Sequence, residues 1–129
     1  MDIPRKGRCI LVAEDDAILR YTLVRTLTRH GYHPLEAADG AQALQIAEKH
    51  EGPIDLLITN VAMPRVGGTE LARTLKQQRP EMRVLIVSGF HKAVFPPDVL
   101  EYAEALLKPV EPNDLVAQVD QLLGTAEPT

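Results

Sequence analysis

Polar side chains follow four short apolar segments of this 129-residue chain, and their types suit phosphate and metal chemistry. They are Glu14 and Asp15 after residues 10–13, Asn60 after residues 54–59, Ser88 after residues 84–87, and Lys108 after residues 105–107. A carboxylate pair beside further oxygen ligands suits magnesium, whereas lysine and serine can contact the oxygens of a phosphoryl group. The pattern indicates an acidic phosphoacceptor site in which Asn60 stands where a reactive carboxylate is expected.

The elements that must position these side chains alternate along the chain between short β-branched strands and segments of helical period. This alternation is typical of a parallel sheet that is covered by helices on both faces. Five strand–helix pairs predict an α/β fold with a flavodoxin-like, doubly wound five-stranded sheet, order 2-1-3-4-5, and five helices. Because ligands of such sheets bind at the carboxyl ends of the strands, we expect the polar side chains to meet in one crevice there.

The expected boundaries follow from capping residues, glycines and prolines. Strands are expected at residues 10–13, 33–36, 54–59 and 83–87, with a fifth that ends at residue 107. Helix starts are expected near Asp16, Asp39 and Pro112, and Thr69 is expected to cap the third helix. Pro96-Pro97 is expected to make the fourth helix short, late or irregular. We interpret residues 1–129 as a single domain with its core at about residues 8–123 and with frayed ends.

The composition argues against several classes of protein. The net charge of −4 and the scattered basic residues argue against direct nucleic-acid binding. The single cysteine, Cys9, excludes an internal disulfide and a cysteine-based zinc site, and it is expected to be buried. No apolar run approaches the ~18 residues that cross a bilayer, and the N-terminus lacks the apolar core of a signal peptide. We therefore expect a cytoplasmic protein without a membrane partner.

The order of these motifs resembles the receiver domain of bacterial two-component response regulators, from residue 10 to about residue 123. Receivers carry an acidic pair after strand one, an acceptor aspartate followed by Met-Pro-x-x-x-Gly, a Ser or Thr after strand four, and a Lys-Pro after strand five. The matching residues are Glu14-Asp15, Asn60 with Met63, Pro64 and Gly68, Ser88, and Lys108-Pro109. The sequence around Asp55 most resembles receivers that are fused to hybrid histidine kinases.

The resemblance implies an acyl-phosphate mechanism that Asn60 cannot perform. In the family, the acceptor carboxylate attacks phosphohistidine or a small phosphodonor, with magnesium bound by Asp15, the acceptor and the backbone carbonyl of Ala62. An amide is a far poorer nucleophile than a carboxylate. Asp55 is no substitute, since at ~3.3 Å per residue it lies ~16 Å back along the same strand. We expect weakened magnesium binding, and an Asn60 amide that donates to Asp15 or Glu14.

Two interpretations of Asn60 stay open: a natural pseudo-receiver, or an engineered Asp-to-Asn change in an ordinary receiver. The natural case is favoured because a second position departs from the family pattern. Ala105 lies three residues before Lys108, where receivers usually carry a Tyr or Phe whose ring couples the phosphorylation site to the output face. Together with Pro96-Pro97, this change indicates altered switching machinery.

The resemblance also implies the partners of the chain. The first helix and the loops around Asn60 and Ser88 would face a histidine kinase or a phosphotransfer domain. The fourth helix, fifth strand and fifth helix would face an output domain or protein, or a second copy of the chain.

The competing class is a magnesium-dependent phosphotransfer or phosphohydrolase enzyme on a similar sheet, in which Asp16 would also act. Such enzymes commonly carry acids near the last strands, whereas this chain has Ser88 and Lys108 there. A dinucleotide-binding module would need a Gly-rich turn after the first strand, where Glu14 and Asp15 would repel phosphate. The histidines lack a metal-ligand spacing, and only His91 is expected near the rim of the site.

Overall fold

A five-stranded parallel sheet forms the centre of the computed structural model, which describes residues 3–89 and 95–126. Its strands are β2 (Cys9–Ala13), β3 (His33–Ala37), β4 (Leu56–Asn60), β5 (Arg83–Ser88) and β6 (Ala103–Leu107). Their order in the sheet is β3-β2-β4-β5-β6. This order confirms the predicted 2-1-3-4-5 arrangement.

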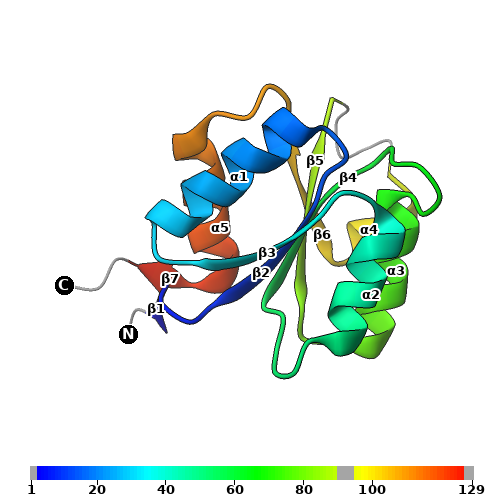
Figure 1. The fold of residues 1–129 in the computed structure, drawn as a ribbon, viewed down its shortest axis with the longest axis horizontal. Coiled ribbons are helices and arrows are strands. Elements are labelled where there is room, and N and C mark those ends of the chain that lie inside the picture. The colour runs from blue at the N-terminus through cyan, green and yellow to red at the C-terminus, as the bar shows by residue number, and fades with distance from the viewer. Residues whose placement is uncertain (1–2, 90–94, 127–129) are drawn as a thin grey trace.

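Helices cover both faces of this sheet, as Figure 1 shows. They are α1 (Ala17–Arg29), α2 (Gly40–Lys49), α3 (Gly68–Gln78), α4 (Pro97–Leu100) and α5 (Pro112–Leu123). α1 and α5 lie on one face, and α2, α3 and α4 lie on the other. The doubly wound, flavodoxin-like fold that the alternating pattern predicts is therefore confirmed.

Two apolar cores result, because successive residues of a strand point to opposite faces of the sheet. Ile10 and Val12 of β2 pack toward α1 and α5, whereas Leu11 and Ala13 pack toward α2 and α3. All four side chains are completely buried. At ~25 cal/mol per Å² of buried apolar area, such residues supply most of the force that holds the layers together. Burial on both faces explains the continuous apolar runs of the central strands.

The helix starts agree with the sequence except at α3. Asp16 accepts hydrogen bonds from the backbone N–H groups of Ile18 and Leu19, and Asp39 accepts one from Gln42. These carboxylates satisfy donors that the first turn leaves unpaired. The prediction that Thr69 caps α3 is wrong, since Gly67 is the N-cap and no side chain bonds there. The backbone at the start of α3 packs closely against the end of β4. This close approach favours glycine, which has no side chain, at the first residues of the helix.

Within the ends that were expected to fray, the described residues 3–4 and 125–126 form paired strands. β1 (Ile3–Pro4) pairs in parallel with β7 (Thr125–Ala126), beside the amino end of the sheet (Figure 1). Asp120 of α5 joins the two ends, because it accepts hydrogen bonds from Arg5 and Thr125. We call these contacts of Asp120 with Arg5 and Thr125 the terminal clamp. Local sequence patterns do not reveal it, because Arg5 and Asp120 lie more than a hundred residues apart.

The fourth helix is short and late, as the two prolines predicted. α4 spans four residues and begins at Pro97, with Pro96 at its N-cap. The structure does not describe residues 90–94, so the expected position of His91 near the rim of the site lies outside the described residues. Among the described helices, none is both long and apolar enough to cross a membrane.

Candidate functional site

The register of the strands brings the predicted polar residues together at the carboxyl ends of the strands. Ala13 pairs with Thr59 across β2 and β4, so Glu14 and Asn60 both lie one residue beyond this pair. On the other side of the site, the backbone N–H of Lys108 donates to the carbonyl oxygen of Ser88 at 2.8 Å. The four strands therefore deliver their polar side chains to the same edge of the sheet, as the sequence predicted.

The side-chain amide of Asn60 lies at the centre of this group. Its Nδ2 donates to Glu14 Oε2 at 3.3 Å, to Asp15 Oδ1 at 3.1 Å and to the carbonyl oxygen of Ala62 at 3.2 Å. The expectation that this amide donates to Asp15 or Glu14 is confirmed, and it contacts both. One nitrogen thus connects the loop after β2 with the loop after β4.

Glu14 is the deeply placed acid of the pair, with only 1% of its surface exposed. Its Oε2 accepts a hydrogen bond from the backbone N–H of Asp16 at 3.0 Å. Its Oε1 has no hydrogen-bond partner and lies 3.9 Å from the Nζ of Lys108. Arg20 of α1 holds the backbone here, since its guanidinium donates to the Glu14 carbonyl at 2.8 Å. Sequence reasoning missed Arg20, because no motif marks it.

The two carboxyl groups differ in pKa because their surroundings differ. Burial raises the pKa of Glu14, and the neighbouring Asp15 carboxyl adds to this shift. Partial burial would also raise the pKa of Asp15, but its interactions with the Glu14 carboxyl and the Asn60 amide outweigh burial and lower the pKa. The exposed acid is therefore held ionised, while the buried acid resists ionisation.

Asp55 lies at the opposite end of the sheet, as predicted. Its Oδ2 accepts a hydrogen bond from the backbone N–H of Cys9 at 2.8 Å, and Oδ1 lies 3.6 Å from Arg8. Cys9 begins β2, whereas Asp15 follows its end. Asp55 therefore has a structural partner at the amino end and no contact with the site.

The loop between β4 and α3 is packed against its surroundings by two glycines. A Cβ atom on Gly68 would lie 1.9 Å from the Asn60 carbonyl oxygen, and one on Gly40 would lie 2.3 Å from the Val66 carbonyl oxygen. The backbone N–H of Gly68 also donates to the Val61 carbonyl at 2.8 Å. The sequence motif identified Gly68 but not Gly40, whose position reads as an ordinary helix start.

Ala105 lies on β6, opposite Ile86 of β5, and packs partly buried against the core below α2 and α3. Tyr102, the nearest aromatic residue in the sequence, precedes β6 and lies beside Lys76, whose Nζ is 5.7 Å from its ring centre. Tyr102 therefore lies at the amino end of β6, away from Lys108. Tyr102 therefore does not supply the aromatic ring that the resemblance implies for position 105.

The oxygen atoms around Asn60 are of the kind that magnesium prefers. Asp15 supplies a carboxylate oxygen, Ala62 a carbonyl oxygen and Asn60 an amide oxygen. The side-chain nitrogen of Asn60, rather than its oxygen, faces the Asp15 carboxylate and the Ala62 carbonyl. Among residues 3–89 and 95–126, no three His, Cys, Asp or Glu side chains form a metal-binding group. The set fits magnesium only if the Asn60 amide turns over.

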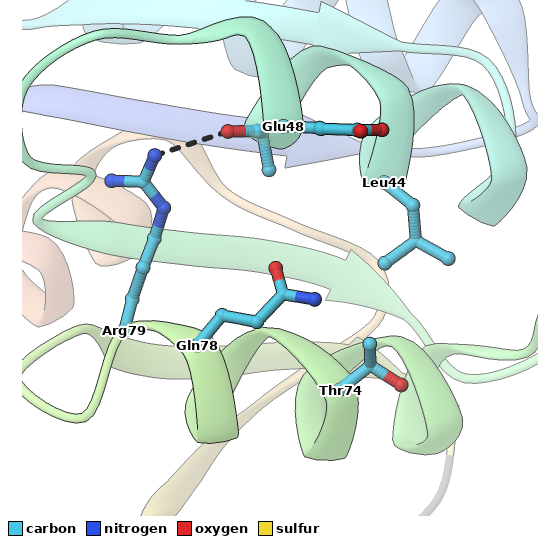
Figure 2. A pocket seen from close by; sticks show the side chains of 6 residues that line it. Leu44, Glu48, Thr74, Gln78 and Arg79 are labelled. Atoms are coloured by element: carbon cyan, nitrogen blue, oxygen red, sulfur yellow. Dashed lines mark hydrogen bonds between the residues drawn. The ribbon is translucent and has the colours of Figure 1, made fainter.

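A separate groove lies between α2 and α3, on the face that also carries α4. Its lining residues are Leu44, Ala47, Glu48, Thr74, Gln78 and Arg79. Figure 2 shows Arg79 reaching across from the end of α3 to α2, where its Nη2 donates to the Ala47 carbonyl at 3.0 Å. None of these residues belongs to the site around Asn60.

Comparison with known proteins agrees with the geometry. The response regulator receiver domain family matches residues 10–120. The response regulator receiver protein CpdR of Brucella abortus is 35% identical over 91% of this chain and 98% of its own length. The sensor kinase CckA of the same organism is 33% identical over 88% of this chain, which spans 12% of that longer protein.

Solved structures give the same result. The receiver domain of the hybrid histidine kinase CckA is 36% identical, with a TM-score of 0.76 over 89% of this chain and 98% of that domain. The relatives thus include a protein of similar length and the receiver of a hybrid kinase, in line with the resemblance of the sequence around Asp55. The chain belongs to the response regulator receiver domain family of two-component signalling.

Proposed function

We propose that this chain is a receiver that signals by protein–protein contact without forming an acyl phosphate at position 60. The observation that carries the proposal is the Asn60 side chain, whose nitrogen faces Glu14 and Asp15 at the end of β4. An amide there cannot act as the carboxylate nucleophile of the phosphotransfer reaction. The module is not an enzyme in this proposal, because its output is the binding of a partner.

The partner on the side of α1 is a histidine kinase or a phosphotransfer domain. Two large apolar side chains of α1 support this assignment, since Ile18 is 80% exposed and Tyr21 is 61% exposed. They follow Asp16, the cap residue next to the acidic pair, on one face of the helix. Exposed apolar and aromatic residues are typical of the centres of protein interfaces.

The partner on the opposite side is an output domain or protein, or a second copy of the chain. Leu107 at the end of β6 supports this assignment, because 42% of its surface is exposed on the edge strand of the sheet. We place the protein in the cytoplasm, where Cys9 would stay a free thiol.

Magnesium is the cofactor that the family resemblance implies for this site, and this chain would bind it only weakly. Asp15, Asn60 and the backbone carbonyl of Ala62 would hold the ion, which would supply positive charge to the site. Loss of one carboxylate charge at ~4 Å from a divalent ion costs roughly 8 kcal/mol at an effective dielectric of 20, before desolvation is subtracted. The amide oxygen recovers only part of this attraction.

Incubation with acetyl phosphate and magnesium tests the proposal. The intact mass of the wild type should stay unchanged, whereas Asn60→Asp should gain the mass of one phosphoryl group. Asn60→Gln is the matched control, because it keeps an amide and should gain none. A phosphoryl adduct on the wild type would refute the proposal, and turnover of a generic phosphate ester by the wild type would favour the enzyme class.

A further inference from the structure

We propose that the Asn60 side-chain amide is a built-in substitute for the divalent cation, which holds the site assembled and makes it insensitive to magnesium. The inference rests on the proposed function, because it concerns the regulation of the same site. It predicts a receiver whose partner surface has one arrangement, whatever the metal concentration.

The amide nitrogen of Asn60 lies among the oxygens of the site. Nδ2 lies 3.1–3.3 Å from one oxygen each of Glu14, Asp15 and Ala62. Two of these residues, Asp15 and Ala62, are the proposed magnesium ligands. Because the amide has two N–H groups for three acceptors, one of its hydrogen atoms must be shared. The nitrogen therefore occupies the hydrogen-bonding position between the oxygens that a cation would otherwise draw together.

The Asn60 amide also changes the charge of the site. A carboxylate at position 60 would be a third acid beside Glu14 and Asp15, and close like charges destabilise one another. The amide removes that charge and replaces it with a donor. Lys108 lies 3.9 Å from Glu14 Oε1 and supplies positive charge on the other side of the buried acid. The pair is thus compensated by groups of the chain itself.

Binding of a metal ion at this site would carry a cost. Magnesium would have to break the three hydrogen bonds of Nδ2 and turn the amide over, so that its neutral oxygen faces the ion. It would gain a weaker ligand than a carboxylate in return. The competition therefore favours the amide at ordinary magnesium concentrations.

The consequence extends to the loop after β4. The bond from Asn60 to the Ala62 carbonyl fixes the start of this loop against the acidic pair. Its far end is fixed by the bond from the Gly68 N–H to Val61 and by the close contact of Val66 with Gly40. Both ends are tied by neutral contacts that need no ion. A partner that binds here would meet the same surface with and without magnesium.

Thermal unfolding with and without magnesium tests the inference. The Tm of the wild type should change by less than about 1 °C in ~10 mM MgCl₂. Asn60→Asp should melt below the wild type without metal and rise by about 3 °C or more with it. Gln45→Glu is the matched control, since it makes the same amide-to-carboxylate change on an exposed position of α2 and should give no magnesium response.

Side-chain NMR of the wild type gives a second readout that does not depend on the folding of a variant. The Asn60 NH₂ signals of the ¹⁵N-labelled protein should keep their positions through the magnesium titration. Movement of these signals, or a rise in the wild-type Tm equal to that of Asn60→Asp, would overturn the inference. Either result would leave the proposed function intact, because that proposal fails only if the wild type accepts a phosphoryl group.

Discussion

Gly68, the first residue of α3, approaches the backbone of Asn60 so closely that a Cβ atom would lie 1.9 Å from the Asn60 carbonyl oxygen and 2.8 Å from its carbonyl carbon. Both atoms belong to backbone, so the contact cannot be relieved by a side-chain rotation. The helix and the strand end that carries the site are therefore mutually positioned by the absence of a side chain.

Gly68→Ala should accordingly destabilise the fold by about 1–3 kcal/mol, the usual cost of overpacking, and should displace Asn60. The free energy of unfolding from urea titration measures this effect. Gly67→Ala is the neighbouring control, since its Cβ would lie at an ordinary 3.4 Å from the Val61 carbonyl oxygen. An equal loss in both variants would show that the close contact is not the cause.

The terminal clamp predicts a dependence of stability on pH. Burial alone would raise the pKa of Asp120, but its hydrogen bonds with Arg5 and Tyr32 outweigh burial and lower it. A carboxyl whose pKa is lower in the folded state stabilises the fold above its ordinary pKa of about 3.9, and this stabilisation is lost as the pH falls through the folded value. Asp120→Asn should therefore cost about 1–3 kcal/mol at pH ~7 and less at pH ~3.

Urea titrations at both pH values measure this difference. Asp114→Asn, an exposed acid in the first turn of the same helix, is the control and should show a smaller effect. A cost of Asp120→Asn that stays constant as the pH falls would contradict the proposed role of its charge.

The thiol of Cys9 should be unreactive in the folded protein. Burial first, and then the charge of Asp55, raise the pKa of this thiol to about 11. The reactive thiolate is therefore scarce at pH ~8, and the sulfur is also hidden from solvent. Iodoacetamide should modify the native protein at least about tenfold more slowly than the urea-unfolded protein, as followed by intact mass. Equal rates would show that Cys9 is accessible.

Arg79 should hold the carboxyl end of α2, which carries one wall of the groove in Figure 2. Its guanidinium donates to the carbonyl oxygens of Ala47, His50 and Gly52 at 3.0, 3.1 and 2.8 Å. Arg79→Ala leaves these acceptors without their partner and should cost about 1–3 kcal/mol.

Hydrogen exchange should locate the effect at the last turn of α2. Lys49→Ala removes an exposed basic residue from the same turn and should change stability by less than about 0.5 kcal/mol. Unchanged protection of this turn in Arg79→Ala would contradict the assigned role.

Features that depend on local pattern were predictable. The central strands β2, β4 and β5 were recognisable as continuous apolar runs, because they are buried on both faces of the sheet. Asp16 and Asp39 were recognisable as caps, since capping needs only a short polar side chain within three residues of its donors. The prediction for Thr69 was wrong because packing against Asn60, and not capping, decides how α3 begins.

By itself, the sequence determined which chemical groups follow each strand, and the family resemblance then implied that the Asn60 amide stands at the position of the acceptor carboxylate. Only the tertiary structure decided that the nitrogen of this amide contacts both Glu14 and Asp15, since Asp15 and Asn60 are 45 residues apart. It also decided that Arg5 reaches Asp120, across 115 residues, and closes the ends of the chain. Such contacts escape local patterns because they depend on strand register and helix packing, which the whole core fixes together.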